Sequence, residues 1–241
     1  LTREYDLDLV LTAPSVEYRV NLKSGQTKII HTPAELPDPS LIDNIEEPWV
    51  ATEILLPQQY IGGILELITG RRGIYKNMDY LSDERVLVTA EMPLANIIID
   101  FYDKLKSLSS GYASLNYELL DFRPGDLVKL DILVAQEKVE ALSMIVHRQT
   151  AEAEGRALTA KLKELIPRQQ FEIAIQAAIG GKVVARETIS AVRKDVTKGL
   201  YGGDVTRKMK LLEKQKRGKK RLKRIGSVDI PQEAFLAVLK R

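Results

Sequence analysis

The middle of the chain combines two hydrophobic periodicities. Helical spacing of apolar residues, by three and four, occurs at 61–68 and again at 97–108. Three stretches are predicted as strands, at 49–56, 86–92 and 113–119. A turn at 70–73 leads into one more extended stretch. The predicted order is β-α-β-β-α-β, which is that of the ferredoxin-like split unit.

The residues before this unit have a different composition. Residues 7–20 predict two short strands that are broken at Pro14. Residues 23–48 hold four prolines among Asp, Ser and Glu, which is typical of a linker. We therefore expect residues 1–46 to be the tail of a preceding domain plus a linker, and residues 47–124 to form the ferredoxin-like domain.

A further α+β domain is predicted over residues 125–241. A turn cluster at 121–126 precedes it. Strand-like patterns lie at 128–134, 141–146 and 171–175, and the first two suggest a hairpin that turns at 136–138. Helical spacing is found at 158–166, 189–200 and 232–239. The overall fold class is therefore α+β, with two domains and part of a third.

Composition narrows the chemistry. The 241 residues are 44% hydrophobic and 29% charged, which is the profile of a globular chain able to bury a core. The absence of cysteine excludes disulfides, thiolate metal sites and cysteine nucleophiles. No run of eighteen apolar residues could span a membrane. We expect a cytoplasmic protein, and, since the chain opens without Met, a piece of a longer one.

No catalytic or metal-binding motif emerges. A phosphate-binding loop requires Gly-Lys-Ser/Thr, and neither Gly181-Lys182 nor Gly218-Lys219 is followed by Ser or Thr. His31 and His147 stand in unrelated contexts, without the orienting partner that a general base needs. We therefore predict no catalytic residue, no metal site and no cofactor in this chain.

The formal charge of +3 conceals a strong division. Residues 193–224, here called the basic arm, carry fourteen Lys or Arg and three acids, a net of +11, and the remainder has a net of −8. Such an arm repels itself, and a polyphosphate partner would compensate it and release counterions on binding.

Three interpretations of the basic arm compete. A solvated charge run is the ordinary one, and contact with a protein or with anionic lipid headgroups is another. RNA binding is favoured because predicted folded elements bracket the arm and because other basic residues precede it in the same domain. These are Arg148, Arg156, Lys161, Lys163, Arg168 and Arg186. Since the arm has few Gln or Asn for reading base edges, recognition of RNA shape and phosphates fits better than sequence reading.

Three runs of sequence resemble the LepA (elongation factor 4) family of translational GTPases. They are IPRQQFEIAIQAAIG (166–180), YGGDVTRKMKLLEKQKRGKK (201–220) and IPQEAFLAVLK (230–240). The preceding EPWVATEILLP, RRG and GYASLNYELLDF look like the family's equivalent of domain V of elongation factor G. The resemblance covers essentially the whole chain.

The resemblance implies a ribosome-binding and tRNA-binding part of a GTPase that acts on stalled or mispositioned ribosomes, by reverse translocation and under stress. It implies contacts of the basic arm with tRNA or 23S rRNA, and a monomeric chain. The residues concerned are Arg193, Lys194, Lys198, Arg207, Lys208, Lys210, Lys214, Lys216, Arg217, Lys219, Lys220, Arg221, Lys223 and Arg224. GTP and magnesium are implied for the full-length protein only, so this chain is not expected to be catalytic.

The turn at Arg71 and Arg72 has two interpretations. A charged turn between a helix and a strand is the ordinary one. The resemblance implies instead that both arginines face the large ribosomal subunit. The alternative function for the whole chain is a generic basic RNA-binding module, or one that associates peripherally with the inner face of the cell membrane.

Overall fold

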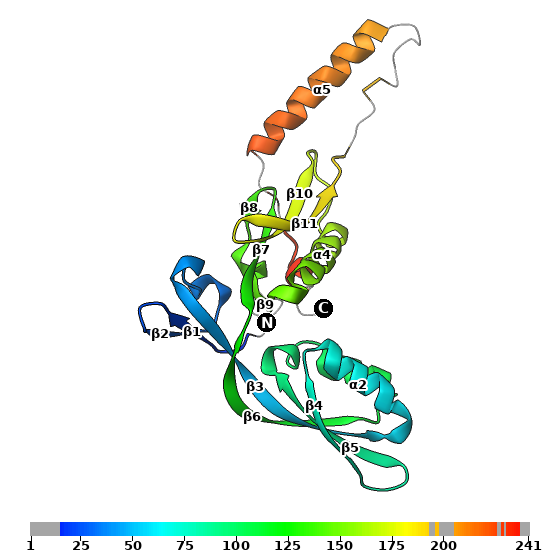
Figure 1. Cartoon of the computed structure of the whole chain (residues 1–241). Coiled ribbons are helices and arrows are strands. Elements are labelled where there is room, and N and C mark those ends of the chain that lie inside the picture. Colours follow the sequence, from blue (N-terminus) through cyan, green and yellow to red (C-terminus); the bar gives the residue numbers. More distant parts are fainter. Residues whose placement is uncertain (1–14, 193–195, 198–204, 226–227, 229, 237–241) are drawn as a thin grey trace, which may run out of the picture.

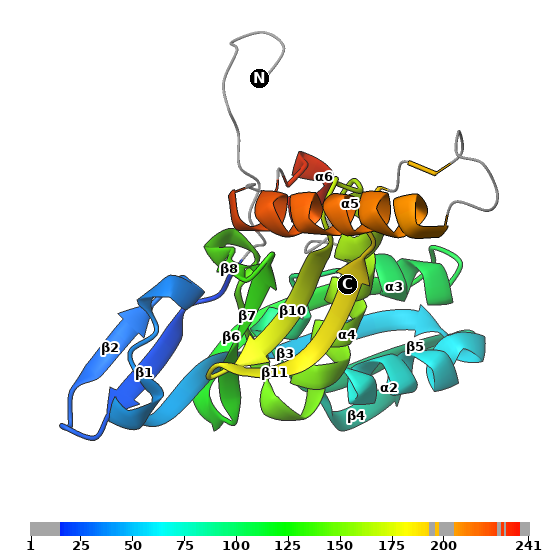
Figure 2. The ribbon, with the colours of Figure 1, turned by 90° about the horizontal axis from the view of Figure 1, so that it is seen from above.

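The computed structural model describes residues 15–192, 196–197, 205–225, 228 and 230–236. The strands in these ranges form two antiparallel sheets with helices packed against them (Figures 1 and 2). This architecture confirms the predicted α+β class. None of the described helices is long and apolar enough to cross a membrane.

The first sheet contains the ferredoxin-like unit. Its strands are β1 (Tyr18–Leu22), β2 (Thr27–Ile30), β3 (Ile42–Pro57), β4 (Ile74–Tyr80), β5 (Arg85–Pro93) and β6 (Ser114–Gly125). Helices α2 (Ile61–Gly70) and α3 (Phe101–Leu108) connect β3 to β4 and β5 to β6. The order β6-β3-β5-β4 in the sheet completes the predicted split β-α-β arrangement.

Strand β3 joins the N-terminal hairpin to the ferredoxin-like unit. One edge pairs first with β1, where Val20 lies opposite Ile45, and then with β5, where Val88 lies opposite Ile54. The other edge pairs with β6 along most of its length. Residues 27–30 and 42–48, predicted as part of a linker, are strand. Pro48 is tolerated because it adjoins a β-bulge between β3 and β6.

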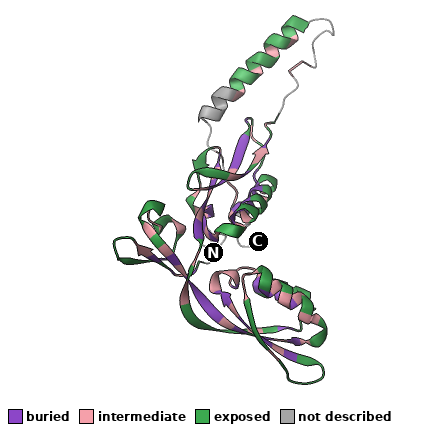
Figure 3. Cartoon of the chain, viewed as in Figure 1, coloured by how far each residue is buried: buried purple, intermediate pink, exposed green. Residues whose placement is uncertain are grey.

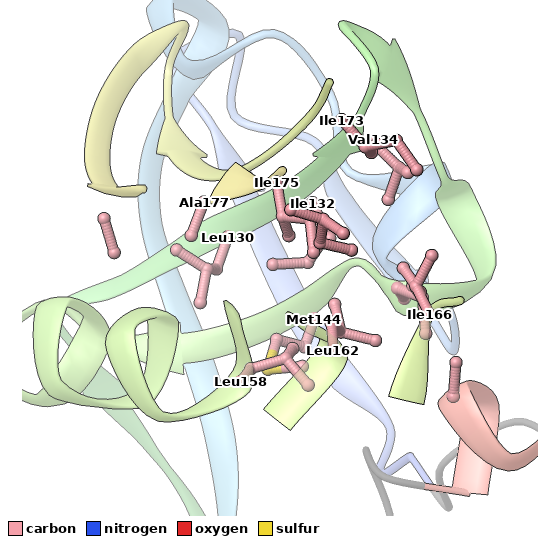
Figure 4. Close-up of a cluster of buried hydrophobic side chains, with 14 of the residues drawn as sticks. Leu130, Ile132, Val134, Met144, Leu158, Leu162, Ile166, Ile173, Ile175 and Ala177 are labelled. Atoms are coloured by element: carbon pink, nitrogen blue, oxygen red, sulfur yellow. The ribbon is translucent and has the colours of Figure 1, made fainter. Parts of the chain in front are cut away.

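The second sheet forms the C-terminal domain. Its strands are β7 (Leu127–Val134), β8 (Glu137–Lys138), β9 (Met144–His147), β10 (Ile173–Ile179) and β11 (Lys182–Ile189). Helix α4 (Arg148–Leu165) lies across it, and the short helix α6 (Gln232–Leu236) packs beside α4. Side chains of β7, β10 and α4 form one apolar core (Figure 4). The predicted strand 128–134 and the helix ending near 166 are confirmed.

Two predicted elements of the C-terminal half are wrong. Residues 121–126 are not a turn, because β6 continues to Gly125. Pro124 is tolerated there because β6 is an edge strand, so its missing N–H interrupts no second ladder. Ile189 ends strand β11 and begins no helix, and residues 190–192 are irregular. The rest of that predicted helix, apart from Val196 and Thr197, lies outside the described residues.

Helix α2 ends in a motif that explains the basic turn. The Gly73 N–H donates to the Ile68 carbonyl at 2.8 Å and the Arg72 N–H to the Thr69 carbonyl at 3.1 Å, which is the Schellman pattern. Arg72 takes the left-handed position, with φ 63°, that glycine usually fills. Gly73 follows where the chain passes closest to the helix, because a Cβ on it would lie 2.8 Å from the Ile68 carbonyl oxygen.

Replacing Gly73 by Ala is expected to destabilise the chain. The new methyl group would overlap backbone at Ile68 and the Met92 side chain, which predicts a loss of about 1–3 kcal/mol in the free energy of unfolding. Gly70→Ala is the matched control, because a Cβ there meets nothing within 4 Å. Urea unfolding of both variants would measure the difference, and equal stabilities would contradict the packing argument.

Candidate RNA-binding surface

Helix α5 (Val205–Ile225) contains most of the basic arm. The helix stands away from both sheets, with its N-terminal end farthest from them (Figure 1). Most of its described side chains are exposed (Figure 3). A half-buried stripe at spacings of three and four is formed by Lys208, Leu211, Gln215 and Lys219. The helix therefore has one narrow inner face, and the rest of its circumference meets solvent.

The cations of α5 fall into different environments. Lys210, Lys214 and Lys216 are exposed and have no ion pair or hydrogen bond within the described part of the chain. Arg217 Nη2 lies 3.0 Å from Glu213 Oε1, an exposed pair one turn apart. Lys219 Nζ instead donates to the carbonyl oxygen of Val192 at 2.9 Å. The charges of Lys210, Lys214 and Lys216 thus have no counter-charge among the residues that the structure describes.

Spacing aligns four exposed cations of α5 in one row. Residues 207, 210, 214 and 217 follow each other by three, four and three positions, so they share one side of the helix. The same spacing continues in the sequence to Arg221 and Arg224. A row of cations along one side can follow a phosphate backbone. Because residues 205–225 include no aromatic side chain, base stacking of the kind used for single strands is absent from this surface.

The remaining predicted arm residues divide into three groups. Arg193, Lys194 and Lys198 lie outside the described residues. Lys220, Arg221, Lys223 and Arg224 belong to α5, but their side chains are outside the described part. Arg207 and Lys208 lie on the described helix, the first exposed and the second half-buried.

Comparison with protein families identifies the two domains. Residues 134–240 match the family model of the GTP-binding protein LepA C-terminus, and residues 44–133 match that of the elongation factor G C-terminus. The two matches together show a C-terminal portion of a LepA-type translational GTPase. Among solved structures, a crystal structure of a protein from Thermus thermophilus is 27% identical, covering 34% of this chain and 12% of that one, with a TM-score of 0.32.

Three other basic residues of the LepA-type C-terminal domain pair with carboxylates of the same chain. Arg148 pairs with Asp126 at 2.9 Å, Arg156 with Glu152 at 2.6 Å, and Lys163 with Glu187 at 2.7 Å. These residues supported the RNA interpretation at the level of sequence, yet each lies beside a carboxylate, as Arg217 lies beside Glu213 on α5. Arg186 is exposed on β11 with no ion pair in the described residues. In the described part of this domain, cations without a carboxylate partner therefore lie on β11, at Arg186, as well as on α5, where Lys210, Lys214 and Lys216 share one helix.

The arginines of the turn after α2 form ion pairs with carboxylates of the same chain. Arg71 Nη2 lies 2.5 Å from Asp100 Oδ1. Arg72 makes two hydrogen bonds, of 2.5 and 3.1 Å, to the carboxylate of Glu47. The Glu47 side chain is only 2% exposed, so it depends on this partner for charge compensation. These contacts favour the structural interpretation of the turn, while its predicted ribosome contact stays a prediction.

The Arg72–Glu47 pair lies where the two domains meet. A Cβ on Gly125, which ends β6, would lie 2.7 Å from Glu47 Oε1, so a larger residue there would displace the carboxylate that Arg72 holds. His147 is close enough that burial first, and the Arg72 charge second, lower the pKa of its imidazole. Its Nδ1 accepts from the Gln149 N–H at 3.4 Å and so caps the start of α4. His147 thus has a structural role at the domain joint.

Glu47→Gln tests this assignment. The amide keeps the shape but leaves Arg72, one-fifth exposed, without its counter-charge, which predicts a loss of about 2–4 kcal/mol in unfolding free energy. Arg156→Met is the control, because that exposed pair contributes at most about 0.5 kcal/mol. Thermal unfolding would compare the two. A loss no greater than that of the control would rule out a stabilising role for the pair.

Proposed function

We propose that this chain is the ribosome-binding and tRNA-binding part of a LepA-type translational GTPase. In this proposal the factor acts on stalled or mispositioned ribosomes, by back-translocation and under stress. The chain itself binds RNA and catalyses no covalent step. The observation that carries the proposal is the row of exposed cations on α5, together with the uncompensated charges of Lys210, Lys214 and Lys216 in the described part of the chain. Its support from relatives is that the chain belongs to a family of translation factors.

The chemistry of α5 favours RNA phosphates as its ligand. Exposed lysines bind a polyanion by releasing the counterions condensed on it, and they need no base-specific geometry. The arm offers few groups for reading base edges and no aromatic platform on α5. Structured RNA, such as tRNA and large-subunit rRNA, meets these requirements. GTP and magnesium belong in this proposal to the whole factor, whose hydrolytic activity the chain would tune.

Replacing Lys210, Lys214 and Lys216 by Gln is expected to weaken binding to ribosomes and tRNA strongly. Each lost phosphate contact lowers the slope of log affinity against log salt by about one. The unfolding transition should hardly change, because these side chains are exposed and have no partner in the described residues. Ribosome co-sedimentation and tRNA filter binding across a salt series would measure the affinity and its salt slope. Thermal unfolding would measure the stability.

The control neutralises three exposed lysines of the hairpin and the ferredoxin-like unit, Lys23, Lys28 and Lys76, whose ammonium groups bond to Ser40, Glu35 and Glu91 within the chain. It should leave RNA binding unchanged. Equal losses in both triple variants, or a wild-type affinity that does not depend on salt, would contradict the proposal. Acidic vesicles should compete poorly with tRNA, and preference for vesicles would favour the membrane-surface alternative. GTP binding by this chain alone would contradict the proposed division of labour.

A further inference from the structure

The segment that follows β11 is hydrogen-bonded to Arg168 and Gln169, which come shortly after α4. Arg168, just after α4, donates from Nε to the Ser190 carbonyl at 3.0 Å. Its Nη2 donates to Ser190 Oγ at 3.1 Å and to the Ala191 carbonyl at 3.2 Å. The Val192 N–H donates to the Gln169 carbonyl at 2.8 Å. Residues 190–192 are therefore hydrogen-bonded to the segment that follows α4, although they form no regular structure.

This tied segment also carries a contact to α5. The carbonyl oxygen of Val192 accepts a hydrogen bond from Lys219 Nζ at 2.9 Å. Lys219 belongs to the half-buried stripe of the helix, whereas Lys210, Lys214 and Lys216 are exposed. An ammonium group that donates to this carbonyl is oriented toward the body of the domain. It is thereby less available to an external phosphate than the lysines on the outer side.

We infer that Arg168, residues 190–192 and Lys219 form an anchor that fixes the direction of α5. In this arrangement Lys219 is a positioning residue, although the sequence places it among the RNA-binding cations. Arg168 acts one step further back, by holding the segment that presents the Val192 carbonyl. The inference rests on the proposed RNA-binding function, and it divides the basic arm into cations that hold the helix and cations that meet RNA.

The physical consequence of losing each kind of cation differs. Loss of an outer lysine removes a phosphate contact, so both affinity and its salt dependence fall. Loss of the Lys219 hydrogen bond removes no phosphate contact. It lets α5 sample more orientations, and ordering the helix on RNA then opposes binding. Affinity falls in that case with little change in the salt slope.

Salt-dependent binding of unfractionated tRNA to the 241-residue chain separates these two effects. Lys214→Met should lower the log–log salt slope by about one. Lys219→Met should weaken binding several-fold with a slope close to that of the wild type. Lys219→Arg keeps a donor for the Val192 carbonyl and should restore wild-type affinity. A slope loss for Lys219→Met equal to that of Lys214→Met would overturn the inference.

Distance measurements test the anchor without RNA. Because the chain has no cysteine, spin labels can be placed at Leu212→Cys and Val183→Cys, two exposed positions on α5 and β11. Double electron–electron resonance should give a narrow distance distribution that broadens with Lys219→Met or Arg168→Met. Lys214→Met and Lys219→Arg should leave it narrow. An unchanged distribution in Lys219→Met would refute the anchor.

The two experiments fail in distinguishable ways. If no form of the chain binds tRNA, the proposed function is wrong, and the label distances still decide whether the anchor exists. If tRNA binds and the distances are insensitive to Lys219, the function stands and the anchor is wrong. Circular dichroism of Lys219→Met checks that α5 keeps its helicity, so that broadening reports orientation and not unfolding.

Discussion

A buried carboxylate determines how the parts of this chain are joined. Glu47 lies in the strand shared by the hairpin and the ferredoxin-like sheet, and it is almost fully removed from water. An isolated buried charge is too unfavourable to persist, so the fold must keep the Arg72 guanidinium beside it. That requirement explains why a non-glycine residue holds the left-handed position after α2, and why a side chain at Gly125 would disturb the ion pair. The two domains therefore meet around one ion pair.

The sequence predicts the elements that have one face toward the core and the opposite face toward solvent. Strands β5 and β7 alternate cleanly, and α2 has apolar residues at helical spacing, so all three are found where the pattern indicates. The pattern fails where a polar residue belongs to a tertiary ion pair. Glu187 interrupts the apolar positions of β11 and pairs with Lys163, which hides the alternation of that strand. Arg123 similarly disguises the end of β6, where it pairs with Glu91 of β5.

The basic arm is visible in the sequence because it depends on composition alone. What the sequence does not distinguish is the environment of each cation. Arg148 and Lys163 look as available as Lys214, yet their carboxylate partners, 22 and 24 positions away, come close only in the folded chain. Lys219 is hidden for a different reason, since its partner is a backbone carbonyl 27 positions away and carbonyls carry no sequence signal. The net charge of the arm can be read from the sequence. The partners that distinguish one cation from another are brought together only in the folded chain.

The position of Lys219 near one end of α5 makes the helix a lever. From Lys219 back to Val205 the helix extends by about 21 Å, at the helical rise of about 1.5 Å per residue. A rotation of ~10° at the pivot would then displace the far end by ~4 Å, more than half the pitch of the helix. Small changes at the base of the helix are thereby amplified at its tip. The stiffness of one hydrogen-bonded segment sets how sharply the outer lysines are aimed.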